Sequence, residues 1–419
     1  MTLAQGVVDV LCQYCGHVIH VEWNRPVPRP EHTRALTVYV PPASAARVPI
    51  FFVAGAAAVM AVGGIAFSLL LFRGASDANN DVVGGALENV KRGLASAPSF
   101  PVHCGLNGSV EIVGQTFSGE GTLIEGEVNC KIRIRDSKLK GDVVVDAKNL
   151  VEVTVENSTL EGKQAAIQSR MNSKIRLTKQ SQLRAQEAAI LAGLNTEISL
   201  RDSQISGDEQ GIKAEHNVRI EAFSSKISGN ETGILGSLNA KISGRDVEVS
   251  GGRSGIEAQH NLELSLEGGK VEGKEAGVRC KGSNAELKLT RKARIASPEV
   301  AVSGDNNLHL EMRDAQIDGG EIGVQASSNP KLALLAGARV HGGRVAIKAG
   351  LNLELEMREA TLASEGVALC APFNIEVSAR TSTISGRDAF RFERPSDKLE
   401  LEGTSVTGAR VFNAKSCNP

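Results

Sequence analysis

Two cysteines and two histidines near the amino terminus form a group of side chains whose types and spacing are typical of metal binding. Cys12 and Cys15 stand at C-x-x-C spacing, so two thiolates can hold one metal ion from a single tight turn. Gly16 allows the backbone twist that such a turn needs. His17 and His20 follow closely and can supply nitrogen ligands. Because structural zinc takes four such ligands, zinc is the cofactor that this segment predicts.

Residues 1–23 resemble the first half of a zinc ribbon, because alternating apolar residues on each side of the Cys-x-x-Cys-Gly turn predict two short strands. The second Cys-x-x-Cys pair of that family is missing. Either His17 and His20 complete the site within one chain, or two chains of a homodimer each contribute Cys12 and Cys15. The alternative is a metal-free segment or a pair capable of forming a disulfide. Reduced thiols fit the cytosol, which favours a cytoplasmic amino terminus.

Residues 48–72 form a run of 25 uncharged residues between Arg47 and Arg73, which is long enough for a helix that crosses a bilayer. A secretory signal peptide would be shorter and would begin closer to the first residue. The positive charges on the two flanks are balanced, so the expected cytosolic thiols decide the orientation. Small residues such as Ala54 and Ala58 have the spacing through which such helices dimerise.

The segments outside this span and the repeat region are predicted to be linkers and a tail. Residues 24–47 are rich in proline and predict a linker. Residues 73–103 predict a second linker, in which the weakly amphipathic stretch 81–95 is expected to form a helix that caps the following domain. Residues 413–419 are expected to form a tail.

The region 104–412 repeats every 22–23 residues. Asparagines recur there at intervals of 20 to 23 residues. Their positions are Asn107, Asn129, Asn149, Asn172, Asn195, Asn217, Asn239, Asn261, Asn284, Asn307, Asn329, Asn352 and Asn374. Three aliphatic columns with a local period of two accompany them, which predicts three short strands per repeat. Leucine-rich repeats need a denser leucine framework and one strand per repeat, so these separated columns disfavour them.

Three short strands per repeat describe one coil of a parallel β-helix, and the region resembles the right-handed parallel β-helix superfamily, the architecture of pectate lyases and related proteins. The fold class is therefore all-β, with about 13–14 coils in a rod on the order of 65 Å long. We expect the asparagines to form a buried internal ladder of hydrogen-bonded amides. Glycines that follow the second strand predict a bend in left-handed conformation. They are Gly141, Gly162, Gly207, Gly229, Gly251, Gly273, Gly319, Gly342, Gly386 and Gly408.

A column of charged residues follows the glycine bend and predicts an exposed ridge, because single carboxylates one coil apart do not converge on a substrate. Its members are Glu187, Glu209, Glu231, Arg253, Glu275, Glu299, Glu321, Arg344, Glu365 and Asp388. The ridge could bind divalent cations or a basic partner, or it could simply keep the rod soluble. We favour the second interpretation. His216 and His260 stand two coils apart and predict packing at a turn.

The cysteines of the repeat region permit an oxidising exterior without requiring one. Cys104 and Cys130 lie near each other at the first coils and could form a disulfide. Cys280 and Cys370 fall at nearly the same point of the coil but four coils apart, about 19 Å, which is too far for a bond. We expect Cys280 to be a small buried residue.

Composition favours a structural or binding role over catalysis. The formal charge of −1 argues against nucleic-acid binding. The repeat region has no Trp or Tyr for stacking on sugars, and no insertion interrupts its coils. We therefore expect a single-pass protein of the bacterial inner membrane whose β-helix is a non-enzymatic rod in the periplasm or outside the cell, with a protein or glycan partner. The alternatives are a polysaccharide lyase or hydrolase of the β-helix type, and a filament-forming scaffold similar to bactofilins, whose repeats are shorter.

The zinc hypothesis predicts that residues 1–47 bind zinc through Cys12 and Cys15. Metal analysis of this segment measures the stoichiometry, and Cys12→Ser is expected to lower it because a thiolate ligand is lost. A zinc content below roughly half an equivalent, unchanged by Cys12→Ser, would contradict the site.

Overall fold

The computed structural model describes residues 7–11, 18–22, 99–394 and 398–414, in two units, 1–84 and 85–419, which are described separately. In the first unit, β1 (Val7–Leu11) pairs antiparallel with β2 (Val18–Glu22). This hairpin confirms the two short strands predicted around the cysteine pair. His20 lies in β2 in register with Asp9 of β1.

Other predictions for this part of the chain fall outside the described residues. These are the ligands Cys12, Cys15 and His17, the linker 24–47, the membrane span 48–72 and the helix 81–95. Within the ranges that the structure describes, no helix has the length and apolar character needed to cross a membrane.

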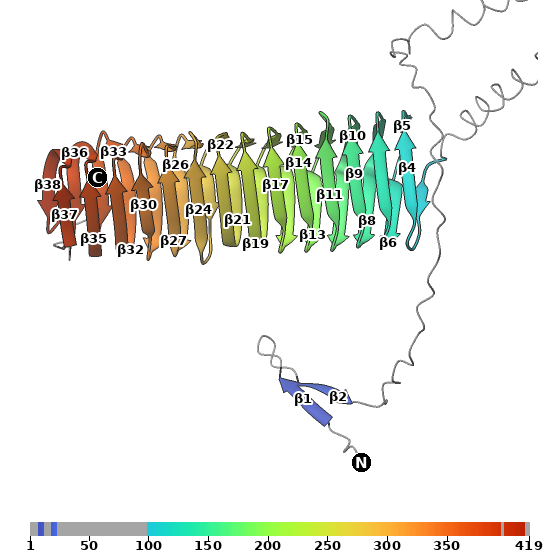
Figure 1. Cartoon of the computed structure of the whole chain (residues 1–419), viewed down its shortest axis with the longest axis horizontal. Coiled ribbons are helices and arrows are strands. Elements are labelled where there is room, and N and C mark those ends of the chain that lie inside the picture. The colour runs from blue at the N-terminus through green and yellow to red at the C-terminus, as the bar shows by residue number, and fades with distance from the viewer. Residues whose placement is uncertain (1–6, 12–17, 23–98, 395–397, 415–419) are drawn as a thin grey trace, which may run out of the picture. The chain divides into compact units, whose positions relative to one another are not determined.

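The second unit is a parallel β-solenoid of about 14 turns (Figure 1), which confirms the β-helix. Each complete turn adds one strand to each of three parallel sheets, named faces A, B and C in chain order. Face A contains β4 (Ser109–Val113), β7 (Lys131–Arg135), β9 (Glu152–Glu156), β11 (Lys174–Thr178), β14 (Glu197–Arg201), β17 (Arg219–Phe223), β24 (Ala285–Thr290), β27 (Leu308–Arg313), β30 (Lys331–Leu335), β35 (Phe373–Arg380) and β37 (Lys398–Glu402).

Face B is built from the shortest strands. They are β5 (Thr116–Ser118), β12 (Gln182–Ala185), β15 (Gln204–Gly207), β18 (Lys226–Gly229), β20 (Glu248–Gly251), β22 (Lys270–Gly273), β25 (Arg294–Ser297), β28 (Gln316–Gly319), β31 (Arg339–Gly342) and β33 (Thr361–Ser364). Four longer strands start on face B and continue onto face C. They are β8 (Lys138–Asn149), β10 (Thr159–Met171), β36 (Thr383–Phe392) and β38 (Ser405–Phe412).

Face C completes each turn. Its own strands are β3 (Val102–Cys104), β6 (Thr122–Val128), β13 (Ala188–Leu194), β16 (Gln210–His216), β23 (Ala276–Cys280), β26 (Val300–Asn306), β29 (Ile322–Ser328) and β34 (Val367–Ala371). Three further strands start on face C and run without a break onto face A. They are β19 (Thr232–Arg245), β21 (Ser254–Glu267) and β32 (Val345–Arg358).

Successive coils stack in register, so that like side chains lie directly above one another. On face C, Ile190, Ile212, Ile234 and Ile256 pair in consecutive strands and are all buried. Neighbouring strands lie about 4.8 Å apart, so equal side chains in one column are close enough to pack against each other in the interior. The core is therefore one continuous cluster that extends through the turns.

The asparagine ladder is present, but our prediction that it is buried was wrong. The asparagines lie at the exposed corner between faces C and A, which we call the asparagine corner. All except Asn149 adopt φ between 49° and 57°, the left-handed region that asparagine tolerates better than most residues. From Asn172 to Asn374, each Nδ2 donates to Oδ1 of the asparagine one coil nearer the amino terminus, at 2.6–3.2 Å. The left-handed turn directs these side chains outward, where they bond along the surface.

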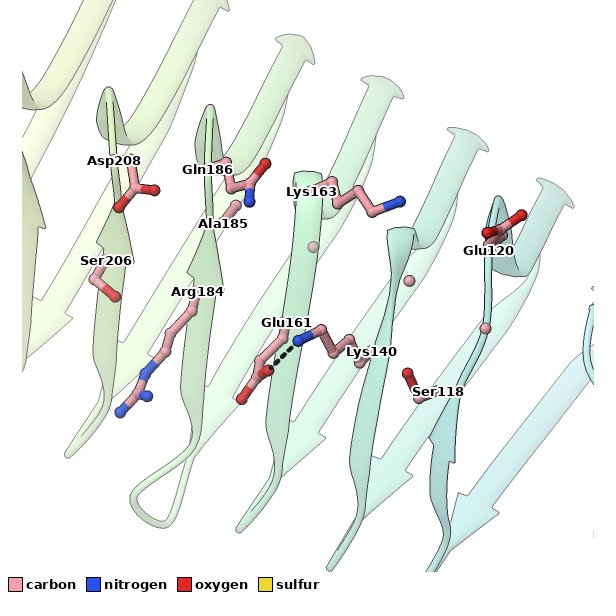
Figure 2. A pocket seen from close by; sticks show the side chains of 13 residues that line it. Ser118, Glu120, Lys140, Glu161, Lys163, Arg184, Ala185, Gln186, Ser206 and Asp208 are labelled. Atoms are coloured by element: carbon pink, nitrogen blue, oxygen red, sulfur yellow. Dashed lines mark ion pairs between the residues drawn. The ribbon is translucent and has the colours of Figure 1, made fainter.

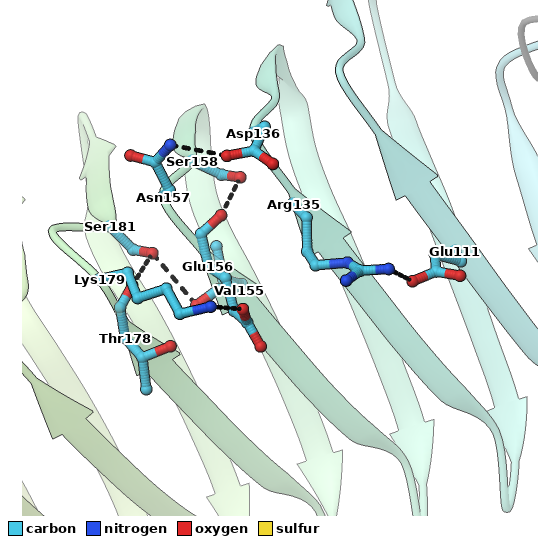
Figure 3. A network of polar contacts seen from close by, with 10 residues as sticks. All are labelled: Glu111, Arg135, Asp136, Val155, Glu156, Asn157, Ser158, Thr178, Lys179 and Ser181. Carbon is cyan, nitrogen blue, oxygen red and sulfur yellow. Dashed lines mark hydrogen bonds and ion pairs between the residues drawn. The ribbon is translucent and has the colours of Figure 1, made fainter. Parts of the chain in front are cut away.

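Serines take the buried polar role that was predicted for asparagine. A second left-handed corner, between faces A and B, was not predicted; Asp136 there has φ of 50°. The next residue, Ser137, is buried, and its backbone N–H donates to Oγ of Ser158 one coil on, at 3.1 Å. Oγ of Ser158 in turn donates to the carbonyl oxygen of Glu156 at 2.7 Å (Figure 3). The polar groups that stack inside the coil at this corner are therefore hydroxyls.

The glycines between faces B and C, the glycine corner, do not adopt the left-handed conformation that was predicted. Among the predicted glycines only Gly408 has positive φ, of 121°. Their role is steric instead. A Cβ atom on Gly207 or Gly251 would press into the carbonyl oxygen of Gln210 or Ser254, three residues further on. The chain folds back so tightly here that only a hydrogen atom fits.

The asparagine corner predicts a difference between two substitutions of Asn239, which bonds to Asn217 and Asn261. Asn239→Gly removes the amide bonds but retains easy access to the left-handed region, whereas Asn239→Ala loses both. The alanine variant is therefore expected to be less stable than the glycine variant by about 1 kcal/mol. Urea-induced unfolding followed by circular dichroism measures the difference. A glycine variant as unstable as the alanine variant would show that the amide bonds, and not the backbone conformation, set the requirement.

Candidate binding surface

Outward side chains of face A pair with one another across neighbouring coils. Lys174 of β11 contacts Glu197 of β14 at 3.0 Å. Lys331 of β30 contacts Glu354 of β32 at 2.9 Å. Exposed pairs of this kind contribute about 1 kcal/mol or less to stability. Their larger effect is that much of the charge on this face is neutralised within the rod.

The predicted charged column follows the glycine corner, and most of its members are exposed. Asp388 differs, because it is buried and forms an ion pair with Arg391 at 2.7 Å. In the described part of the chain, no three His, Cys, Asp or Glu side chains are grouped so as to hold a metal ion. The zinc site at Cys12, Cys15, His17 and His20 stays a prediction, since its cysteines and His17 lie outside that part.

A buried carboxylate of β21 is the most enclosed charge on the solenoid. Glu257 is 3% exposed and lies on the outward side of face C. Nζ of Lys281 lies 2.6 Å from Oε1, and Nη2 of Arg253 lies 3.4 Å from Oε2. Oγ of Ser254 also contacts Oε2, at 3.3 Å. Burial alone would raise the pKa of Glu257, but the Lys281 hydrogen bond and the surrounding positive charges outweigh it and lower the pKa below 4.5.

A hollow of about 610 Å³ lies on face B beside the glycine corner (Figure 2). One row of its side chains, Ser118, Lys140, Glu161, Arg184 and Ser206, follows the strands of face B. A second row, Glu120, Lys163, Gln186 and Asp208, follows the corner. The glycines between the rows carry no side chain, which is why the surface is recessed there.

Ion pairs neutralise much of the charge around this hollow. Nζ of Lys140 lies 3.6 Å from Glu161, and Nζ of Lys163 lies 2.8 Å from Asp142. The hydrogen bond from Lys163 lowers the pKa of Asp142, and that carboxylate likewise raises the pKa of Lys163. The hollow is therefore lined mainly by paired charges and hydrogen-bonding groups, and not by an isolated acid or base.

A second hollow of about 570 Å³ lies further along the same face and corner. It is lined by Ser250, Glu272, Lys274, Arg294, Asp318 and His341, together with the corner glycines. Arg294 and Asp318 pair at 2.8 Å. Sequence analysis predicted the corner glycines but did not single out the polar side chains of either hollow, because outward positions change from coil to coil and carry no period. A third hollow, of about 520 Å³, lies over the asparagine corner between Asn239 and Asn307.

The histidines and cysteines of the solenoid are dispersed. His216 and His260 lie two coils apart at the asparagine corner, in register through Leu238. Cys104 and Cys130 form a disulfide with Cα atoms 6.1 Å apart, as the sequence suggested.

Cys280 is buried and free, as predicted, and burial raises the pKa of its thiol. Cys370 is disulfide-bonded.

No family model, curated protein or solved structure matches the chain. The functional argument therefore rests on the residues and geometry of this protein.

Glu257 and Glu263 of β21 provide a matched test of buried and exposed charge. Glu257→Gln is expected to cost about 1–2 kcal/mol at neutral pH, because two cations lose their shared buried partner. Glu263→Gln, in an exposed pair with Lys241, is expected to cost less than about 0.5 kcal/mol.

The lowered pKa of Glu257 also determines how its contribution to folding stability depends on pH. Its stabilisation is complete above the ordinary pKa of 4.5 and is lost as pH falls through the lower folded-state pKa. Urea midpoints should therefore converge for wild type and Glu257→Gln in acid. A difference between the two that persists unchanged in acid would contradict the charge network.

Proposed function

We propose that this chain is a single-pass protein of the bacterial inner membrane that presents its β-solenoid outside the cytoplasm as a non-enzymatic rod with a binding or structural role in the cell envelope. The uncharged run 48–72 supports the anchor. The Cys104–Cys130 disulfide and the disulfide at Cys370 fit an oxidising compartment. The amino-terminal hairpin would then face the cytosol, where Cys12 and Cys15 stay reduced and can hold zinc.

The arrangement of the two hollows on face B carries the binding part of the proposal. They share one face and one corner, so both open along the same side of the rod. Their shallow, polar linings suit an extended chain that makes many weak hydrogen bonds. Glycan strands of the cell envelope have this chemistry. Because carboxylates such as Glu161 and Asp318 are held by neighbouring cations, binding is favoured over hydrolysis, which needs an available acid and base.

The binding proposal predicts that the full chain in detergent retains envelope glycans on an array without cleaving them. A combined Arg184→Ala and Lys274→Ala variant should bind at least about tenfold more weakly, because each hollow loses a cation. Lys213→Ala, on face C, is the control and should bind normally. Release of shorter glycans, detected by mass spectrometry, would support the enzyme alternative. Equal binding by the double variant and the wild type would contradict the assignment to face B.

The orientation is tested in cells. Protease added to spheroplasts should digest the solenoid and leave an amino-terminal tag protected. Digestion of the tag with protection of the solenoid would reverse the proposed topology.

The last described coil of the solenoid favours end-to-end assembly as a second function, in the manner of a filament-forming scaffold. Within the described residues, β37 and β38 have a partner strand on one side only. Leu399, Leu401 and Val406 are half-buried, and Phe412 is 40% exposed. Unpaired strands above an apolar interior are a template for another chain.

End-to-end assembly predicts that the full chain forms larger particles as its concentration rises, measured by sedimentation and electron microscopy. Phe412→Asp should abolish this growth, since a charge at the end opposes stacking. Leu351→Asp, an equally exposed position away from the end, should leave it intact. Growth that resists Phe412→Asp would contradict assembly through this end.

A further inference from the structure

An exposed apolar stripe runs along the first coils at the asparagine corner. It consists of Leu106, Val128, Leu150, Met171 and Leu194, which are 38–68% exposed. The residues belong to consecutive coils. The N–H of Asn107 donates to the carbonyl oxygen of Val128, the N–H of Leu150 donates to that of Met171, and Met171 pairs with Leu194. In the third coil Asn149 lies in register with Val128 and Met171, and Leu150 stands beside this column. Beyond these coils the column continues with His216, Leu238 and His260. A continuous exposed apolar surface on a soluble domain marks an interaction site.

The backbone is unusual at the centre of this stripe. In the other coils from Asn107 to Asn374, an asparagine holds the left-handed position of the corner. In the third coil Asn149 comes one residue earlier, and Leu150 takes that position with φ of 55°. Leucine tolerates this conformation much less well than asparagine. The strained position therefore carries an exposed leucine, and strain retained in this way points to a function.

Charges flank the stripe with opposite sign on its two sides. In the second coil, Glu127 precedes the corner on face C and Lys131 follows it on face A. In the third coil the signs are reversed, with Lys148 before the corner and Glu152 after it. Lys131 forms no ion pair within the described residues, and Glu127 has only a distant contact with Lys148, at 3.9 Å.

We propose that the stripe is a homodimer interface, in which a second copy of this chain packs side by side and parallel to the first. A two-fold axis along the rod places the face A flank of one copy opposite the face C flank of the other at the same level. Lys131 then meets Glu127 of the second copy. In the third coil Glu152 would meet Lys148 of the second copy, but both are already neutralised within their own chain, Glu152 by Arg176 and Lys148 by Glu125 at 2.5 Å. In the fourth coil Arg170 would meet Lys174, but both are already neutralised, by Asp146 at 2.9 Å and Glu197 at 3.0 Å.

The antiparallel arrangement does not make the same contact. Its two-fold axis runs across the rod and sets face A opposite face A, so Lys131 cannot meet Glu127 of the second copy. The charges of the solenoid therefore favour the parallel orientation. It is also the orientation that two chains anchored in one membrane would share, which is the only point at which the inference touches the proposed function.

Site-specific cross-linking of the full chain in membrane vesicles tests both the interface and its direction. Leu106→Cys and Leu194→Cys are introduced singly and treated with a short bismaleimide, and the linked peptides are identified by mass spectrometry. A parallel dimer joins each introduced cysteine to the same residue of the other copy. An antiparallel dimer would instead join the two positions to each other when both variants are mixed, and that result would overturn the proposal. Links only to other proteins would also overturn it.

Charge variants provide an independent test. Lys131→Glu and Glu127→Lys each place like charges across the parallel interface, so each variant alone should lose most of its Leu194→Cys cross-link. An equal mixture of the two should recover it, because both contacts again join opposite charges. Failure of the mixture to recover the link would contradict the pairing.

Aspartate substitutions separate the stripe from the rest of its column. Leu150→Asp together with Met171→Asp should weaken dimerisation at least about tenfold, while Leu351→Asp, in the same column further along, should not. Circular dichroism confirms that all three chains fold. A stripe variant that folds and still cross-links as efficiently as the wild type would overturn the interface. These readouts do not involve glycans. The dimer proposal can therefore fail while the proposed glycan binding holds, and glycan binding can fail while the dimer is confirmed.

Discussion

Every part of this structure depends on the stacking of one coil on the next at the spacing of neighbouring β-strands. The backbone bonds of a coil are made almost entirely to the coils before and after it, so each coil must copy the path of its neighbour. A residue suited to one level is therefore suited to all, which explains why Ile190, Ile212 and Ile234 recur in one column. The period in the sequence is the direct record of this constraint.

The constraint made the fold predictable from the sequence, down to three strands per repeat. The disulfide between Cys104 and Cys130 was only a possibility in the sequence, and the structure shows it. The constraint did not reveal whether the side chains of a given column point into the coil or toward solvent. The asparagines are periodic whether they point inward or outward, and only the left-handed backbone at their corner decides the matter. The amides therefore lie in solvent, and serines such as Ser137 and Ser158 supply the buried polar contacts.

Cys280 and Cys370 show how small the difference between inside and outside can be. Cys280 pairs in register with Ala258 and Gly304 of the inward column. Cys370 lies one residue away from the equivalent position, in register with Lys348, and belongs to a separate small cluster. Because successive residues of a strand face opposite sides, this one-residue offset places the Cys370 side chain on the outer side of the sheet. A repeat spacing that is known only to within one or two residues cannot distinguish the two positions.

The candidate binding surface was beyond prediction for a related reason. Its hollows arise where the glycine corner lacks side chains, and the residues beside them differ in every coil. Selection for stacking imposes a period only on positions that neighbouring coils both need. Positions that face a partner are free to vary, so Arg184 and Lys274 carry no signal in one sequence. The same freedom allows the apolar stripe to occupy the first coils and to give way to histidine further along.

Nearest-neighbour stacking also makes the rod extendable. A repeat of 22–23 residues adds about 4.8 Å of length. The strand edges that it offers to the next coil match those on which it stacks itself. Duplication or deletion of one repeat would thus change how far the tip reaches from the first coil while leaving the first coils and their disulfide untouched. For a molecule built in this way, reach is a quantity that evolution can adjust in equal, small increments.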